Sequence, residues 1–452
     1  MRIGTRAIAW MAVLSMSFVA PPARADVMTA DQAVQFALKN SSSAIAAKAN
    51  VLSARGGVQG AYAGVLPHVS LNVSRSGSQT DQLSQQQFFA STVGIPYHSI
   101  HDYRYSTTPA LNGTWNVLNL SSLSNLSSAK HDLQSFEHSE RAARNDVALD
   151  TKRLFYEVVK AIKLEDVASA TVKLSRDNEK RVRALFEVGS VSRSDVLRAQ
   201  VNTSQSELDS LVKRQGVLST RVTLAQQLGI EERTLGDVDT TLGVQTATYD
   251  VPTVLAEAKK QRPDIQAAEL EVKSAQLAER SAKFLRLPYL TVNGFYDYNP
   301  SSDTKSVFHV SPDTIEVGHS KSDRSFGGTV ALNWNVFDGM NTDAQISAAR
   351  ARRMRADDAL GVLTRGLEGE VREAIAGYET ALEGETEAES AVASAQENLK
   401  LTQQKYNVGS ATILDLIDAQ VSLARAQSDQ VSAAAAIRVA AAIVDRVRGA
   451  QP

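Results

Sequence analysis

A segment of fifteen residues near the middle of the chain recurs, with substitutions, close to the C-terminus. Residues 186–200 and 406–420 share six identical positions, and most of the others exchange residues of similar character, such as Phe186 for Tyr406 and Ser192 for Thr412. The match extends beyond this segment. A chain built this way is expected to contain one architecture twice, rather than one catalytic domain with loops.

This duplication sets the predicted domain organisation. A signal peptide, residues 1–25, precedes everything else, with Arg2 and Arg6 before an apolar core and a small-residue cleavage site. The two structural repeats and their flanking segments follow, as residues 26–230 (first repeat), 231–251 (connector), 252–448 (second repeat) and 449–452 (tail).

Composition excludes several classes of protein. The chain has no cysteine, so it forms no disulfide and has no lipid-bearing cysteine after the signal peptide. A formal net charge of −2 gives no reason to expect nucleic acid as a partner. No apolar run after the signal is long enough for a transmembrane helix. These observations leave either a soluble periplasmic protein or a membrane protein built from strands.

Proline spacing predicts two very long helices. No proline lies between Pro109 and Pro252, or between Pro312 and Pro452, and both intervals are rich in strong helix formers. We expect continuous helices over residues 122–187 and 340–407. At 1.5 Å per residue each is on the order of 100 Å long, too long to pack into a single globule.

Four segments show the alternation of apolar and polar residues that is typical of strands. They fall at about residues 67–76, 107–118, 287–298 and 325–337, two in each repeat. Strands of a transmembrane β-barrel alternate in this way, and so do the strands of a soluble two-sided sheet. The neighbouring long helices favour the barrel.

Two further features accompany these strands. The mature chain has two tryptophans, Trp115 and Trp334, at matched positions of the two repeats, as expected of membrane-interface aromatics. Polar segments at residues 78–105 and 299–323 are predicted to be exposed loops. Four strands cannot close a barrel, and an open edge is not tolerated in lipid, so a barrel requires an oligomer.

Each copy of the fifteen-residue segment has the pattern of a turn between two helices. Gly189 and Gly409 suit the left-handed conformation that ends a helix. Ser192 and Thr412 are predicted to be N-caps of the next helix. Asp195 and Asp415, three residues further on, complete capping boxes. We therefore expect two helical hairpins.

The whole pattern resembles the TolC-like outer-membrane efflux proteins. The resemblance rests on the signal peptide, the duplicated order of helices and strands, and the Phe/Tyr-x-Val-Gly-Ser turn of each copy. It implies an α+β membrane protein in which a homotrimer forms a twelve-strand transmembrane β-barrel in outer-membrane lipid, continuous with a long α-helical periplasmic barrel. It also implies two partners, a periplasmic membrane-fusion adaptor and an inner-membrane pump of the resistance-nodulation-division, ABC or major-facilitator type.

The function implied is that of the outer-membrane exit duct of a tripartite efflux or type I secretion system. Transport would be passive, and the cargo would be small toxic solutes, drugs, metals or polypeptides. The resemblance places the entrance at the hairpin turns. The alternative function is that of a periplasmic helical-hairpin scaffold without a membrane barrel.

The resemblance also assigns roles within the turns. Asp415 and Asp418 match residues that form acidic rings at the tunnel mouth, and rings of carboxylates favour cations. Tyr406 matches a tyrosine that closes the tip by reaching Ser194 and Asp195. The partner arginine of that closure is replaced by Ala411. Capping remains the competing explanation for Asp195 and Asp415, and a solvated helix face the competing one for Asp418.

Arg193 and Arg198 are candidates to replace the missing arginine. They occupy the positions of Ile413 and Asp418 in the other copy, so the two turns differ in charge at these points. No catalytic motif, cofactor-binding loop or metal-ligand spacing is present in the sequence. We therefore expect a non-enzymatic protein with no cofactor.

Overall fold

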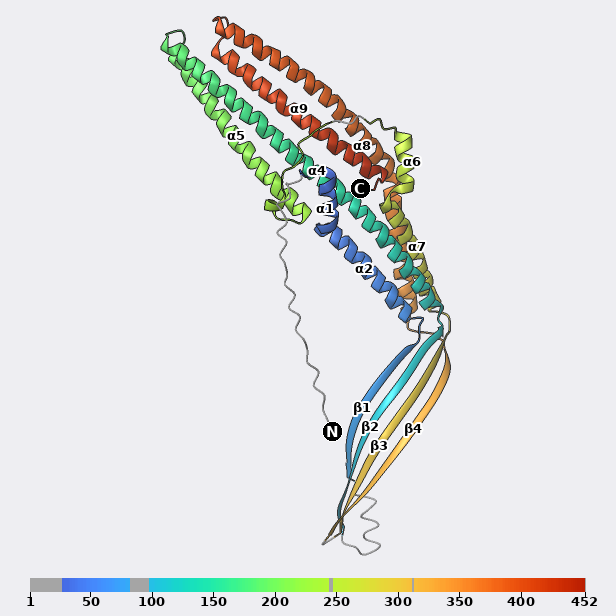
Figure 1. Cartoon of the computed structure of the whole chain (residues 1–452). Coiled ribbons are helices and arrows are strands. Elements are labelled where there is room, and N and C mark those ends of the chain that lie inside the picture. Colours follow the sequence, from blue (N-terminus) through green and yellow to red (C-terminus); the bar gives the residue numbers. More distant parts are fainter. Residues whose placement is uncertain (1–26, 82–96, 244–246, 311–312, 452) are drawn as a thin grey trace, which may run out of the picture. The chain divides into compact units, whose positions relative to one another are not determined.

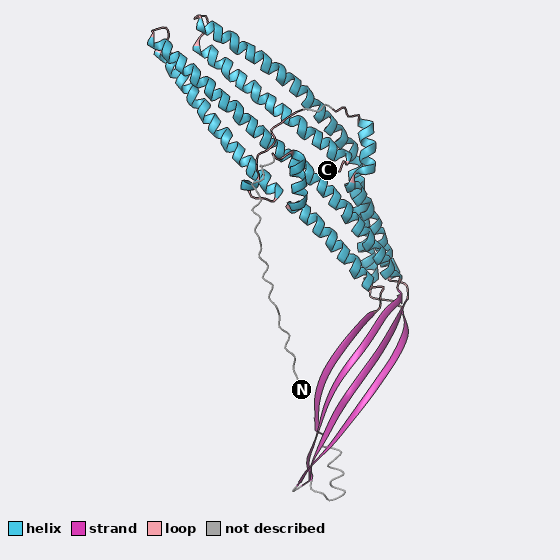
Figure 2. Cartoon of the chain, viewed as in Figure 1, coloured by secondary structure: helices cyan, strands magenta, loops and turns pink. Residues whose placement is uncertain are grey.

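The structure is a computed structural model that describes residues 27–81, 97–243, 247–310 and 313–451. The predicted signal peptide lies outside these residues. The described chain consists mainly of helices, with four long strands (Figures 1 and 2). The elements of the first half are α1 (Ala30–Asn40), α2 (Ser42–Ala63), β1 (His68–Asp81), β2 (Tyr97–Leu118), α4 (Leu120–Glu187) and α5 (Arg193–Leu228).

The second half has the same order of elements. A short 3-10 helix, η1 (Glu232–Thr234), precedes it. Its elements are α6 (Val251–Gln261), α7 (Pro263–Phe284), β3 (Tyr289–Val310), β4 (Asp313–Asn333), α8 (Asn341–Asn407) and α9 (Ile413–Arg448).

The long helices have nearly the predicted bounds. α4 contains 68 residues and α8 contains 67, against the predicted ranges 122–187 and 340–407. Neither helix contains proline, whose ring would clash with the preceding turn and remove a hydrogen bond. Leu367, Val371 and Tyr378 of α8 are spaced four and seven residues apart, on one face of the helix, and are buried.

The strands are longer than predicted, and the described parts of the expected polar loops are strand; residues 82–96 and 311–312 lie outside the described residues. β2 and β3 contain 22 residues each, and β4 contains 21. Residues 78–81 and 97–105 continue β1 and β2, and nearly all of 299–323 belongs to β3 and β4. Sheet pairing uses backbone groups, so the ladder continues where the apolar alternation stops. For the same reason, an alternation-based prediction ends these strands too early.

The four strands form one antiparallel sheet in the order β1-β2-β3-β4. The register gathers apolar residues on one face, since Leu71, Leu111, Tyr296 and Phe326 lie in one cross-strand row. The adjacent alternating positions carry polar residues, and His68, Thr114, Asn293 and Thr329 form such a row. Side chains alternate between the faces of a sheet, so this sheet has one apolar and one polar face.

The chain divides into two compact units, and neither coincides with a half of the sequence. The first contains the described residues up to Ser42, with Val147–Thr248 and Ala376–Ile443. The second contains Ser43–Asp146, Tyr249–Ile375 and the described residues from Val444. Each unit therefore combines segments from both halves.

In the second unit, serines connect α4 to α7 at seven-residue steps. The hydroxyls of Ser128 and Ser274 lie 2.9 Å apart, and those of Ser121 and Ser281 lie 3.0 Å apart. Ser135 donates to the carbonyl oxygen of Ala267, 2.9 Å away. A seven-residue repeat keeps the same face of each helix in contact, and small side chains let the two backbones approach closely.

The same unit contains an ionic network around the buried Arg262. Arg262, at the junction of α6 and α7, donates to Asp264 and to Glu370 of α8, and Arg446 of α9 donates to Glu370 and to Asp146 of α4. Burial opposes the charge on Asp264, but hydrogen bonds from Arg262 outweigh it and lower the pKa of the carboxyl. Arg262, the buried member, is paired with two carboxylates, as the burial of a charge requires.

Both tryptophans lie where the sheet meets the helices. The indole Nε1–H of Trp115 donates to the carbonyl oxygen of Val65, just after α2, at 2.9 Å. That of Trp334 donates to Arg286, just after α7, at 3.1 Å. The prediction placed Trp334 within the fourth strand, but β4 ends one residue before it. The indole N–H takes a main-chain acceptor at the end of a helix in both copies.

Candidate functional site

The two fifteen-residue segments form the turns of two helical hairpins in the first unit. The first hairpin joins α4 to α5 and the second joins α8 to α9, and both turns lie at the same end of this unit (Figure 1). Gly189 and Gly409 each have φ of +78°, a conformation that side-chain-bearing residues rarely adopt.

Both helices that enter the turns end in the same hydrogen-bond pattern. The amide of Ser190 donates to the carbonyl of Leu185 at 2.9 Å, and that of Ser410 donates to Lys405 at 2.8 Å. These six-to-one bonds, with a left-handed glycine between donor and acceptor, satisfy carbonyl groups at the helix ends.

A capping box begins each following helix. The amide of Asp195 donates to the Ser192 hydroxyl at 3.2 Å, and the amide of Ser192 donates to the Asp195 carboxylate at 3.0 Å. In the second hairpin, the amides of Asp415 and Thr412 make the equivalent bonds at 3.2 and 2.8 Å. Backbone and side-chain hydrogen bonds from Thr412 lower the pKa of Asp415. Both aspartates therefore have a structural role.

Asp418 has a different environment. It lies one helical turn beyond Asp415, is exposed, and makes no hydrogen bond or ion pair with any described residue. Arg193, Ser194 and Arg198 are also exposed, in the first turn of α5 and just beyond it. These are surface positions, and no contact within the described chain accounts for the side chains at Asp418, Arg193 and Arg198.

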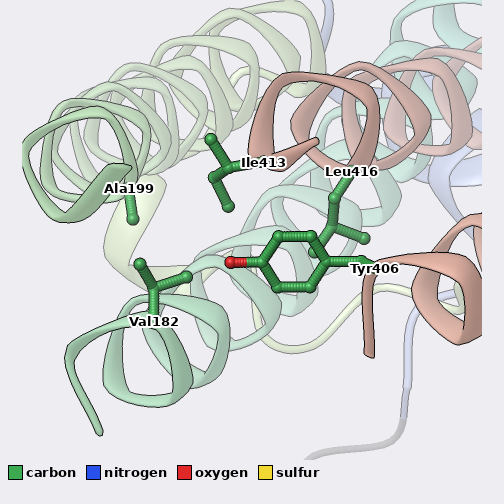
Figure 3. Close-up of a cluster of buried hydrophobic side chains, with 5 residues drawn as sticks. All are labelled: Val182, Ala199, Tyr406, Ile413 and Leu416. Carbon is green, nitrogen blue, oxygen red and sulfur yellow. The ribbon is translucent and has the colours of Figure 1, made fainter. Parts of the chain in front are cut away.

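Tyr406 lies in an apolar cluster between the two hairpins (Figure 3). Its ring packs among Val182 of α4, Ala199 of α5, and Ile413 and Leu416 of α9. The hydroxyl points toward the side of Val182 and Ala199 and has no hydrogen-bond partner among the described residues. Burial, followed by the nearby Asp195 carboxylate, raises the pKa of this phenol.

Within one chain, therefore, Tyr406 lies near Asp195 but is not hydrogen-bonded to Ser194 or Asp195. The Asp195 oxygen Oδ2 is occupied by the amide and hydroxyl of Ser192. Ala411, at the position of the missing arginine, is half-buried against the cluster. Sequence reasoning missed the apolar residues around Tyr406, whose spacing on separate helices gives no sign that they meet.

Comparison with known proteins identifies the family. The family model described as "Outer membrane efflux protein" matches residues 33–230 and 254–450, most of the chain in two successive segments. The chain belongs to the outer membrane efflux protein family. It is accordingly an outer-membrane channel protein that extends into the periplasm, and not an enzyme.

Individual relatives agree with this family. Outer membrane protein TolC of Vibrio cholerae serotype O1 is 23% identical over 357 residues, which cover 78% of this chain and 75% of that protein. The Campylobacter jejuni CmeC outer membrane channel superposes with a TM-score of 0.75 at 15% identity, covering 93% of this chain and 85% of the other. VceC of Vibrio cholerae gives a TM-score of 0.70 at 18% identity, covering 93% and 96%.

Two further properties of the described residues bear on the site. No helix among them is both long enough and apolar enough to cross a membrane. The same residues contain no group of three or more His, Asp or Glu side chains arranged to hold a metal ion.

The two aspartates of the second turn are predicted to respond differently to replacement. Asp415→Ala removes the acceptor for the Thr412 amide, so this amide should exchange hydrogen faster at pH 7. A carboxylate whose pKa is lowered by folding stabilises the fold above its unfolded pKa, and this stabilisation is lost as the pH falls through the folded value. The difference from the parent should therefore vanish in acid.

Asp418→Ala is the matched control, because it removes a carboxylate from the same helix without removing a cap. Hydrogen exchange followed by mass spectrometry distinguishes the two variants. Equal acceleration in both would contradict the capping role of Asp415.

Proposed function

We propose that this protein is the outer-membrane exit duct of a tripartite efflux or type I secretion system. Three copies would form a twelve-strand transmembrane barrel and a helical periplasmic tunnel, each chain being an internal duplication. The main support is the sheet itself, which combines an exposed apolar face, a polar face and two edge strands, β1 and β4, within one chain.

The sheet edges favour an oligomer on energetic grounds. Backbone groups at an open edge have no partner in lipid, and each costs several kcal/mol when left unsatisfied there. β1 and β4 run in opposite directions, so β1 of one copy can pair with β4 of the next in the same antiparallel manner as the rest of the sheet. Large apolar side chains such as Leu71 and Phe326, 67% and 83% exposed, then face lipid.

A second surface, on α5, also favours association with other copies. Five apolar residues are more than half exposed and recur at coiled-coil spacing, namely Leu197, Val201, Leu208, Leu211 and Leu218. Such a stripe is the seam of a helix that packs against another helix. The described chain leaves the stripe exposed, and we assign it to the contact between neighbouring copies.

We assign the entrance to the hairpin turns. Asp418, exposed and unpaired, is the better candidate for a selectivity ring, since Asp415 is held by its capping box. Three copies would place three such carboxylates around the opening, where they attract cations and repel anions. Tyr406, with Ser194 and Asp195, remains the proposed latch. Arg193 or Arg198 is the proposed substitute for the arginine replaced by Ala411.

The proposed partners are a periplasmic membrane-fusion adaptor and an inner-membrane pump that supplies the energy. The cargo class comprises small toxic solutes, drugs, metals or polypeptides. Residues 1–25 are assigned as a signal peptide, 26–230 and 252–448 as the two repeats, 231–251 as the connector and 449–452 as the tail. The two separate segments of the family match are compatible with this division.

Cysteine cross-linking tests the trimer. The chain has no cysteine, so introduced residues are its only thiols. Asn72→Cys on β1, combined in turn with Thr329→Cys, Ala331→Cys or Asn333→Cys on β4, is expected to give covalent trimers in one of the three registers. Denaturing gels should show single, double and triple chains, with nothing larger.

Ser70→Cys with Asn112→Cys is the control, because these residues are directly paired on β1 and β2. This pair should link within one chain and give no oligomer. Dimers as the largest product, open-ended ladders, or no link in any register would exclude the trimeric barrel.

Single-channel recordings test the selectivity ring. Asp418→Asn should reduce the preference for cations and weaken block by multivalent cations by about fivefold or more, since each copy loses one charge at the opening. Asp429→Asn is the control, because it removes a charge from the same helix at a position paired with Arg425. Unchanged selectivity in the Asp418 variant would contradict the proposed selectivity ring.

A leak assay tests the latch. Tyr406→Phe removes only the buried hydroxyl, so it should preserve the fold while increasing antibiotic entry into cells. Tyr378→Phe is the matched control, because this buried tyrosine of α8 accepts a hydrogen bond from the Ala247 amide, away from the turns. If the Tyr406 variant excludes antibiotics as well as the parent does, the hydroxyl is not a latch.

A further inference from the structure

Two buried amide side chains lie unpaired between the hairpins. Asn178 of α4 is 2% exposed and Gln420 of α9 is 3% exposed. Both the oxygen and the nitrogen of each side chain are buried without a hydrogen-bond partner in the described structure. Buried polar groups are nearly always hydrogen-bonded, so two amides with four unpaired atoms need an explanation.

Their positions place them in one layer of the contact between the hairpins. α4 runs toward the turns and α9 runs away from them. Asn178 lies four residues before Val182, and Gln420 lies four residues after Leu416, and Val182 and Leu416 meet in the apolar cluster. One helical turn from that cluster, on the side away from the turns, the facing positions are therefore both amides.

A groove next to this layer supports the same pairing of helices. It has a volume of about 350 Å³ and is lined by α4 and α9 alone, including Thr171, Leu174, Asp177, Gln420, Leu423 and Gln427. Leu174 and Ala424, each a further turn from the amides, both line it. The antiparallel register of the cluster thus continues past Asn178 and Gln420.

Polar groups inside a hairpin behave differently. Ser175, 2% exposed, bonds both to the carbonyl of Thr171 and to the hydroxyl of Ser206 on α5, at 2.8 and 2.9 Å. Arg176 of α4 pairs with Glu207 of α5 at 2.7 Å. Among residues 170–210 and 399–430, no side-chain hydrogen bond or ion pair connects the two hairpins. Polar side chains of α4 thus find partners on α5 within the first hairpin, whereas the unpaired amides lie between the two hairpins.

We propose that Asn178 and Gln420 form a polar layer that keeps the two hairpins separable. Burying an amide without a partner costs free energy, and that cost is recovered when the hairpins part and water reaches the layer. The apolar cluster at Tyr406 stabilises the contact between the hairpins, and the amide layer beside it reduces the stability of that contact. The effect of this layer on the stability of the contact does not depend on the proposed function, whereas its effect on channel opening rests on that function.

The test replaces both amides with leucine. Replacing both polar partners by apolar groups of similar size removes the desolvation cost without leaving a new unpaired group. Asn178→Leu/Gln420→Leu should raise the midpoint of thermal unfolding by roughly 2–4 °C. Hydrogen exchange at residues 174–182 and 416–424 should slow by about tenfold. Openings in planar bilayers should become rarer at unchanged conductance.

The single variants and a control distinguish this effect from a general gain in hydrophobicity. Because neither amide has a hydrogen bond to lose, each single variant should give part of the gain, and the double variant should give the most. Gln205→Leu/Gln404→Leu replaces two exposed amides, one in each hairpin, with leucine and should not slow exchange at the layer.

The proposed polar layer is contradicted if the double variant is less stable than the parent, or if its amides exchange hydrogen as fast as those of the parent. Slowed exchange with an unchanged frequency of opening supports the polar layer and overturns its role in channel opening. If the parent protein itself forms no channel, the proposed function fails, and the exchange and unfolding measurements still decide whether the layer weakens the contact.

Discussion

The left-handed glycine followed by a capping box is the constraint on which the hairpins depend. A helix of 68 residues stops at Gly189 because the backbone there takes a conformation that continues no right-handed helix. The Ser192–Asp195 pair then satisfies the first amides of α5, so the chain reverses within a few residues. The same solution at Gly409 reverses α8, and it brings Tyr406 and Val182 into one cluster.

Similar sequence in the two turns produces similar backbone, while the positions that differ carry the distinct chemistry. The carboxylates of Asp195 and Asp415 both accept capping hydrogen bonds from the amides of Ser192 and Thr412. Arg198 and Asp418 occupy the same place in their respective copies, are exposed, and differ in charge. Two turns can thus share one backbone conformation while each presents different groups to solvent.

The sequence predicts the helices, the turns and the family well, because proline, glycine and capping residues act locally. It predicts the strands only in part. The apolar alternation identifies where each of the four strands lies, but their polar extensions leave no such pattern. Predicting Trp334 inside a strand fails for a related reason, since its hydrogen bond to Arg286 is made with a residue 48 positions away.

Long-range polar contacts are what the sequence does not reveal. Arg262, Glu370 and Arg446 meet from three distant segments, and no local spacing marks them as a network. Asn178 and Gln420 likewise read as ordinary helix residues, and only their burial in one layer makes them unusual. Gln420 is even identical to Gln200, its counterpart in the first turn segment, which is only half-buried.

The two indole hydrogen bonds give the junction between sheet and helices a mechanical property. Trp115 lies near the end of β2 and bonds to the chain just after α2, and Trp334 follows β4 and bonds to the chain just after α7. Each indole therefore links the end of a strand to the end of a helix, and the two elements are not consecutive in the chain. Sliding of α2 or α7 along its axis must therefore move the base of a strand with it or break one of these hydrogen bonds, so the bonds couple the position of each helix to that of a strand.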